Sequence, residues 1–204
     1  MAKVDLKKQL KSLYAPSAKA PVIVDVPKMN FLMVDGTGDP NASAAFQETV
    51  NALYGVAYTL KFSLKKQGGA DFAVMPIEGL WWGADLRNFV TSDKSDWNWT
   101  LMIAMPDVVT AEQGRTAMEE LAKKKEVPAL ARLRFESFHE GGAVQILHVG
   151  PYAAEQPTVE RLVQFAAEKG LELAGKHHEI YLSDPRRCAP EKLKTVIRHP
   201  VRPR

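Results

Sequence analysis

The sequence contains a single cysteine, Cys188, among its 204 residues. One thiol excludes an internal disulfide and every metal site that is built from several cysteine ligands. No Cys-x-x-Cys pair is present, so we interpret Cys188 as a surface thiol rather than a catalytic one. A chain without disulfides suits a reducing compartment, and the sequence therefore predicts a cytoplasmic protein.

Long hydrophobic runs are also missing. No apolar stretch reaches the length of about 20 residues that a membrane-spanning helix needs. The opening residues 1–8 carry charges throughout, which is not the pattern of a signal peptide. With 46% hydrophobic and 25% charged residues, the composition is that of a globular protein with a sizeable core. We expect no membrane association.

No strong excess of one charge is present. The chain has 27 basic and 24 acidic residues, a net charge of +3, and only the tail from Arg186 to Arg204 is plainly basic. That tail has no interleaved aromatic residues, which argues against direct nucleic-acid binding. Residues 1–29 are too few for a helix-turn-helix module, which argues against a transcriptional role.

Cofactor and metal motifs are absent. There is no P-loop and no Gly-x-Ser-x-Gly elbow, and the Gly36-Thr37-Gly38 turn lacks the third glycine of a dinucleotide fingerprint. His177 and His178 are adjacent, but neighbours on a strand point to opposite faces, so they do not form a metal site. We expect neither a cofactor nor a metal.

One order of elements occurs twice along the chain. An apolar strand (residues 30–34, then 144–149) runs into a Gly/Pro turn, an amphipathic helix and two extended stretches. We expect repeat 1 at about 30–105 and repeat 2 at about 143–200. A helix opened by a Thr110 capping box, and a strand ending in a hairpin loop at 140–142, connect them over about 106–142. Together these predict one α+β domain over 1–204, with tandem β-α-β-β repeats, a curved antiparallel sheet, helices on one side and a ligand cleft.

The segment 176–187 carries the most informative side chains. As a strand, it directs His177, Glu179 and Tyr181 to one face and His178 and Ile180 to the other. A carboxylate on a sheet face fits either a solvated edge strand or a sheet-lined cavity in which Glu179 meets a cationic or electrophilic ligand. The segment alone does not choose between the two.

The tandem layout and several motifs resemble the GyrI-like small-molecule-binding family. The motifs are Gln145-Ile146-Leu147-His148-Val149-Gly150-Pro151-Tyr152, His177-His178-Glu179-Ile180-Tyr181-Leu182-Ser183-Asp184-Pro185-Arg186-Arg187, Leu53-Tyr54-Gly55-Val56-Ala57-Tyr58 and Met75-Pro76-Ile77-Glu78-Gly79-Leu80-Trp81-Trp82. Members of this family include drug-binding domains, gyrase inhibitors and hydrolases of cyclopropane-bearing alkylating agents. The resemblance implies a small-molecule ligand.

Under that resemblance, Glu179 becomes the expected general base, with Tyr152 and Tyr181 as hydrogen-bond donors to the reacting molecule. Glu78 occupies a comparable place in the first repeat and is a second candidate acid, although a surface glutamate beside Gly79 explains it equally well.

Aromatic side chains supply the expected ligand-stacking surfaces. Trp97 and Trp99 share a strand face by alternation, and we place both at the mouth of the cleft. Of Trp81 and Trp82, only one can face that side, and core packing explains either equally well; Trp82 is taken as the candidate. The further ligand-binding candidates are Tyr58, for which a half-buried core position is the alternative, and His177.

Three functions stay open on these grounds. The chain hydrolyses strained cyclopropane-bearing electrophiles, it sequesters flat lipophilic or cationic molecules without turnover, or it inhibits gyrase through an exposed surface. The first two share the Glu179 site, whereas the third would tolerate the loss of Glu179.

Overall fold

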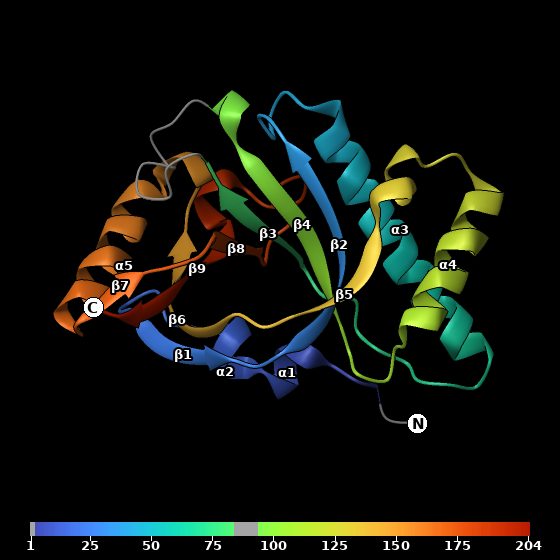
Figure 1. Cartoon of the computed structure of the whole chain (residues 1–204), viewed down its shortest axis with the longest axis horizontal. Coiled ribbons are helices and arrows are strands. Elements are labelled where there is room, and N and C mark those ends of the chain that lie inside the picture. The colour runs from blue at the N-terminus through green and yellow to red at the C-terminus, as the bar shows by residue number, and fades with distance from the viewer. Residues whose placement is uncertain (1–2, 84–93) are drawn as a thin grey trace.

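The computed structural model describes residues 3–83 and 94–204. The strands in these ranges form one antiparallel sheet, ordered β1-β6-β9-β8-β3-β4-β2-β5, with β7 paired to β9 (Figure 1). The strands are β1 Val22–Val26, β2 Met29–Thr37, β3 Ile77–Trp82, β4 Asn98–Met105, β5 Arg134–Phe138, β6 Gly141–Val149, β7 Leu171–Leu173, β8 His177–Tyr181 and β9 Lys194–Pro203. The α-helices are α1 Leu6–Gln9, α2 Lys11–Tyr14, α3 Ala44–Lys66, α4 Ala111–Lys124 and α5 Gln156–Glu168. Among the described helices, none combines the length and hydropathy needed to cross a membrane.

The sheet repeats one connection pattern. The order β2-α3-β3-β4 recurs as β6-α5-β8-β9, and the strand order β6-β9-β8 continues as β3-β4-β2. The second strands of the two units, β8 and β3, therefore pair in the middle of the sheet, with Glu179 opposite Gly79. The α+β class and the tandem β-α-β-β arrangement are confirmed.

The two long helices lie on one face and leave the central strands between them. Helix α3 packs on β2 and β4, α5 packs on β6 and β9, and α4 lies outside α3. Helix α4 begins with the predicted capping box, since Thr110 and Gln113 exchange side-chain and backbone hydrogen bonds. The face of β8 and β3 between α3 and α5 is therefore placed to carry a site.

The predicted hairpin at residues 140–142 is wrong. Strand β5 pairs with β2 at one end of the sheet, whereas β6 lies near the other end between β1 and β9. The chain from β5 to β6 crosses from one end of the sheet to the other beside the connection from β1 to β2, so both ends of the curved sheet come close (Figure 1). Strand β5 therefore pairs with β2 at the edge of the sheet and not with β6, its neighbour in sequence.

The opposite face of the central strands holds a buried polar network. His178 Nε2 lies 3.0 Å from Glu78 Oε2, and His178 Nδ1 lies 3.0 Å from Glu140 Oε1. Arg198 Nη1 donates to Glu140 Oε2 at 3.1 Å, and the hydroxyl of Tyr14 donates to Glu78 Oε1 at 2.8 Å. Burial works against charge here, but the charges and hydrogen bonds of His178 and Arg198 lower the pKa of Glu140 to about 2. This network joins helix α2, the β5–β6 crossing and the strands β3, β8 and β9.

Candidate functional site

Glu179 lies on β8, on the face that α3 and α5 flank. His177 Nε2 lies 3.0 Å from Glu179 Oε1, and the hydroxyl of Tyr181 donates to Glu179 Oε2 at 2.7 Å. The three side chains share one face because strand residues alternate, whereas His178 points into the network on the other side, as predicted. Burial alone would raise the pKa of Glu179, but the hydrogen bonds from His177 and Tyr181 lower it. Glu179 is therefore a carboxylate at neutral pH.

A second carboxyl group, that of Glu155, accompanies Glu179. Glu155 precedes helix α5, is 7% exposed, and lies against the Glu179 carboxylate and beside Thr195 of β9. Burial and the negative charge of Glu179 raise the pKa of Glu155 to about 9. Glu155 keeps its proton below about pH 9 while Glu179 is ionised, so the pair carries a single negative charge at neutral pH.

Aromatic side chains surround the acid pair. The rings of Tyr152 and Tyr181 meet edge to face with centroids 5.6 Å apart. Tyr152 is 41% exposed, and its hydroxyl forms no hydrogen bond within the described part of the chain. Burial, followed by the charges of Glu155 and Glu179, raises its pKa to about 12, so it remains a donor. The predicted residues Glu179, Tyr152, Tyr181 and His177 thus lie together.

Trp81 contributes the apolar side of the site. Its indole lies over Gly79, which pairs with Glu179 across β3 and β8. A Cβ added to Gly79 would lie 2.5 Å from the indole nitrogen, so only glycine leaves room for the ring. The ring of Trp97 meets that of Trp81 at 5.7 Å, and Phe46 of α3 stacks on Trp81 at 5.9 Å. The Trp81 Nε1 group is buried and has no hydrogen-bond partner among the described residues. A neutral donor is therefore free beside the carboxylates.

Glu78 and Trp82 point away from this site, and their assignment to it is corrected. Both are even-numbered residues of β3 and face the opposite side of the sheet from Gly79 and Trp81. Glu78 is 1% exposed and belongs to the polar network, and Lys176 Nζ lies 3.4 Å from the ring centroid of Trp82.

Trp99 and Tyr58 also differ from the expectation. Trp99 shares a face with Trp81, but it is fully buried against Phe46 rather than at an open mouth. Tyr58 is 47% exposed on α3, where its ring stacks with Phe62 and leans on Tyr54. Trp97 alone of the predicted pair borders the Glu179 site through Trp81.

The sequence analysis missed Glu155, and of Trp81 and Trp82 it took Trp82 as the candidate. Acidic residues are common at helix N-termini, where the helix dipole stabilises them, so Glu155 carried no special signal. Gly79 could have indicated that Trp81 faces the site, because a glycine opposite Glu179 leaves room for an indole. Within residues 3–83 and 94–204, no group of acidic, histidine or cysteine side chains is arranged to hold a metal ion.

Comparisons with known proteins agree with this architecture. The family described as the GyrI-like small molecule binding domain matches residues 19–202. An uncharacterized conserved protein from Listeria innocua is 44% identical, with a TM-score of 0.89 over 98% of this chain and 100% of its own. A hydrolase from Listeria innocua is also 44% identical, with a TM-score of 0.87 and the same coverage. No curated protein matches significantly.

The C-terminal domain of EcmrR shares the fold at 13% identity, with a TM-score of 0.57 over 90% of this chain and 98% of its own. The family match covers nearly the whole chain, and the structural likeness extends to relatives of low identity. The chain belongs to the GyrI-like small-molecule-binding family.

Proposed function

We propose that this protein binds flat lipophilic molecules over Glu179 and hydrolyses strained cyclopropane-bearing electrophiles. The observation that carries the proposal is the buried pair of Glu155 and Glu179, of which one is protonated and the other ionised. A passive binding surface has no need of such a pair, whereas adding water to an electrophile needs one group to take a proton and another to give one. The 44% identical hydrolase from Listeria innocua supports the choice.

The reaction follows from the charges of the pair. Glu179 takes a proton from water as the water oxygen attacks the ring CH₂ carbon, and the strained C–C bond breaks. The bonding electrons move through the conjugated system to the carbonyl oxygen, which becomes a phenolate. Glu155 then supplies the proton that neutralises this oxygen, directly or through water, and the product is the ring-opened alcohol. Atoms balance as substrate plus one water.

Two donors that have no hydrogen-bond partner among the described residues are placed to stabilise the developing phenolate. They are the hydroxyl of Tyr152 and the Nε1 group of Trp81, since Tyr181 already donates to Glu179. Donors held in place before the reaction stabilise developing charge without reorganisation. Tyr181 and His177 act as positioning residues, because both fix the Glu179 carboxylate.

The direct test is incubation with a cyclopropyl-indole alkylating agent followed by mass analysis. We expect a product heavier than the substrate by one water, in molar excess over the protein. A stoichiometric complex without this product would contradict hydrolysis and leave binding.

Sequestration of a lipophilic cation is the second candidate, and one observation favours it. The acid pair carries one negative charge next to the rings of Trp81, Tyr152 and Tyr181. Aromatic faces and a carboxylate together suit a flat cation. A binder of this kind would protect only up to one equivalent of ligand.

The acid pair also predicts a pH dependence. Because the pKa of Glu155 is raised to about 9, its proton is present below that pH and is lost above it. We expect kcat/KM to fall as the pH rises through about 9. Glu155→Gln cannot transfer a proton, so its residual activity should be low and should lack this alkaline limb. A pH–rate profile measures the residual activity and the alkaline decrease together. If kcat/KM of Glu155→Gln still falls through about pH 9, the decrease belongs to a group other than Glu155.

A further inference from the structure

Six buried side-chain atoms have no hydrogen-bond partner among the residues that the structure describes. They are Trp81 Nε1, Trp99 Nε1, His148 Nε2, Glu155 Oε1, Gln156 Oε1 and Thr195 Oγ1. Buried polar atoms in folded proteins are nearly always paired, either with other protein atoms or with ordered water. Four of these six atoms belong to β6, to β9 and to the beginning of α5, beside the acid pair of Glu155 and Glu179. Their concentration in one place indicates a common polar partner.

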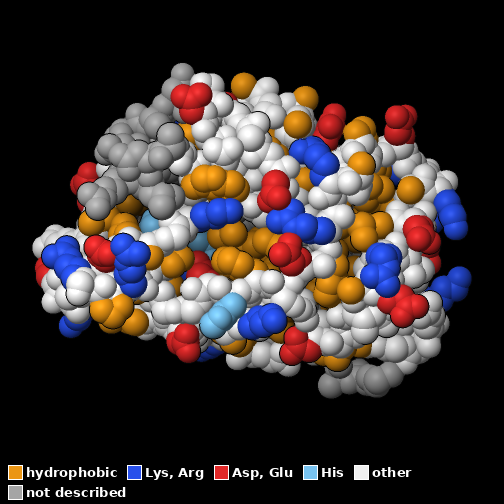
Figure 2. Space-filling model, in the orientation of Figure 1, with side chains coloured by type: hydrophobic (Ala, Val, Ile, Leu, Met, Phe, Trp, Pro, Cys, Tyr) orange, Lys and Arg blue, Asp and Glu red, His pale blue; other side chains and the backbone are white. Residues whose placement is uncertain are grey.

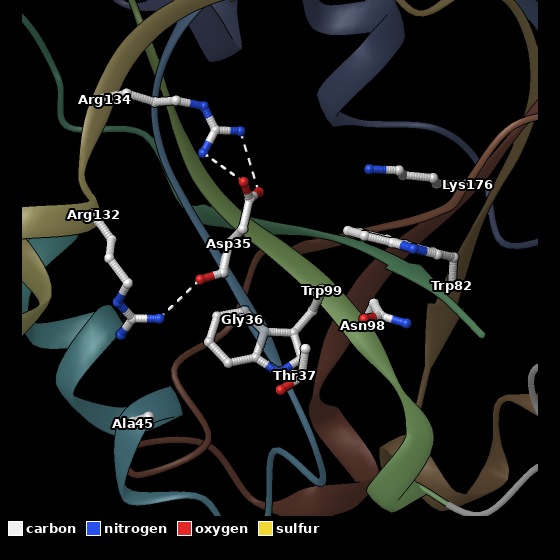
Figure 3. A pocket seen from close by; sticks show the side chains of 10 residues that line it. All are labelled: Asp35, Gly36, Thr37, Ala45, Trp82, Asn98, Trp99, Arg132, Arg134 and Lys176. Carbon is white, nitrogen blue, oxygen red and sulfur yellow. Dashed lines mark hydrogen bonds and ion pairs between the residues drawn. The ribbon is translucent and has the colours of Figure 1, made fainter. Parts of the chain in front are cut away.

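The opposite face of the sheet is different. A hollow of about 540 Å³ lies there, and basic side chains gather in the middle of this face among hydrophobic ones (Figure 2). The charged groups of the hollow already have partners (Figure 3). Arg134 binds the Asp35 carboxylate at 2.8 and 3.1 Å, Arg132 donates to the Asp35 carbonyl at 2.9 Å, and Lys176 covers the ring of Trp82. The unpartnered atoms therefore point to the Glu179 face and not to this hollow.

The strands place His148 and Thr195 side by side under α5. His148 of β6 pairs with Thr195 of β9, and paired residues on neighbouring strands share a face. Tyr181 of β8 pairs with the same threonine from the other side, so this is the face of Glu179. His148 is 6% exposed and Thr195 is fully buried. Both side chains are thus withdrawn from solvent next to the acid pair.

Helix α5 fixes the orientation of the His148 ring. His148 Nδ1 lies 2.9 Å from Thr158 Oγ1, and the backbone N–H of Thr158 donates to the carbonyl of Glu155 at 2.8 Å. Nδ1 is therefore occupied by the helix, and Nε2 is the nitrogen that lacks a partner within the described part of the chain. Gly150 keeps the space beside Nε2 open, because a Cβ at that position would lie 3.1 Å from this nitrogen.

Glu155 approaches His148 and Thr195 from the beginning of α5. Burial and the charge of Glu179 raise the pKa of Glu155 to about 9, and the hydroxyl of Thr195 acts in the opposite direction. Within the described residues, however, neither Glu155 Oε1 nor Thr195 Oγ1 makes a hydrogen bond of ordinary length. Polar atoms that lie near each other without bonding directly are the usual setting for a bridging water.

We propose that a water molecule binds between His148 Nε2, Thr195 Oγ1 and Glu155 Oε1 and positions Glu155 as the acid of the proposed hydrolysis. The water donates to Glu155 Oε1 and accepts from the Thr195 hydroxyl and from the Nε2–H group of His148, whose Nδ1 accepts from Thr158. Three hydrogen bonds are typical of a buried water. Because Oε1 is held as an acceptor, the proton of Glu155 resides on Oε2, the oxygen left for Glu179 and the substrate. His148 and Thr195 are thus positioning residues.

Only the acid role of Glu155 rests on the proposed function; the water site does not. A crystal structure at a resolution that shows ordered water tests the site directly. We expect one water within about 2.7–3.2 Å of His148 Nε2, Thr195 Oγ1 and Glu155 Oε1. Long-range ¹H–¹⁵N spectra should show His148 as the Nε2–H tautomer. A direct hydrogen bond from Thr195 to Glu155, the absence of water at these atoms, or the Nδ1–H tautomer would each overturn the proposal.

A ¹³C NMR titration of the Glu155 carboxyl group tests the positioning without any turnover. Thr195→Val keeps the shape of the side chain but removes its hydroxyl, so the pKa of Glu155 should rise by roughly 0.5–1 pH unit, which corresponds to one hydrogen bond. His148→Leu should raise this pKa as well, whereas His148→Gln, whose amide replaces the Nε2–H group, should stay close to wild type. The other titratable groups that face Glu155 are Glu179, Tyr181 and Tyr152, and these variants retain all three.

Thr100→Val is the matched control. Thr100 is also a buried strand threonine beside a carboxylate, but it donates to Asp35 on the opposite face of the sheet. The pKa of Glu155 should not change in this variant. An unaltered pKa of Glu155 in both Thr195→Val and His148→Leu would overturn the positioning role.

Turnover separates this proposal from the proposed function. If the protein hydrolyses its substrate, the alkaline decrease of kcat/KM should move to higher pH in Thr195→Val, in step with the carboxyl titration, because Glu155 keeps its proton to a higher pH. A decrease that does not follow the titration would overturn the positioning role in catalysis. If there is no turnover, the proposed function fails, while the crystal structure and the titration still decide the water site.

Discussion

Glu179→Gln should lower the turnover of a cyclopropane-bearing substrate by roughly a hundred- to ten-thousandfold, the usual contribution of a general base. Glutamine keeps the length and shape of glutamate, but it cannot take a proton from water. Burial and the negative charge of Glu179 together raise the pKa of Glu155, and glutamine removes the second of these causes. Single-turnover kinetics with mass detection of the water adduct measure the loss, while binding of neutral ligands should persist.

Glu48→Gln is the matched control for this experiment. Glu48 is exposed on α3, so the same chemical change there should leave turnover unaltered. An undiminished rate in Glu179→Gln would remove Glu179 from the catalytic role. Selective weakening of cationic ligands, in a protein that shows no turnover, would identify Glu179 as a counter-ion and favour sequestration.

Glu140→Gln should lower the free energy of unfolding by about 3–5 kcal/mol, the cost of removing one partner from a buried ion pair. The Glu140 side chain is 1% exposed and lies between His178 and Arg198, so its loss removes the counter-ion of buried Arg198 and one of the two carboxylates that face His178, the other being Glu78. Denaturant unfolding of both proteins measures the difference. The control is Glu172→Gln in the exposed pair with Arg202, where we expect less than about 1 kcal/mol.

The pH dependence of this effect has a defined sign. The pKa of Glu140 is lowered from 4.5 to about 2, so its contribution is full above pH 4.5 and is lost as the pH falls through 2. Although burial opposes it, the pairing with Glu140 and Glu78 raises the pKa of His178 from 6.5 to about 9, so its contribution is full below pH 6.5 and is lost as the pH rises through 9. The difference between wild type and Glu140→Gln should therefore be largest between pH 4.5 and 6.5. An equal and small difference at every pH would show that the network adds no stability.

The alternation along β8 was predictable because it is local. A strand period of two is enough to place His177, Glu179 and Tyr181 on one face and His178 on the other. The order of elements also sufficed for the repeated units, since each strand, turn and helix has its own sequence signal.

Pairing register was not predictable in the same way. The sequence analysis expected Glu78 to occupy the position in the first repeat that Glu179 occupies in the second. In the structure Gly79 pairs with Glu179, and a register shift of one residue moves a side chain to the other face of the sheet. For the same reason Trp81 faces the Glu179 side of the sheet and Trp82 faces the other side. Glu155 depends on where α5 lies on the sheet, and the position of β5 depends on the free edge of β2; both are contacts between distant parts of the chain.

Alternate residues of strand β8 face the Glu179 site and the buried polar network. In the proposed function, Glu179 and its odd-numbered neighbours carry the chemistry, whereas His178 connects the strand to the polar network with Glu78 and Glu140. Natural variation can therefore change ligand preference at the odd positions while the even ones preserve the architecture. Point substitutions can explore new ligands on this strand, but insertion or deletion of a single residue would exchange the two sets and damage both at once. In lineages that retain this fold, divergence of β8 should proceed by replacement rather than by change of length.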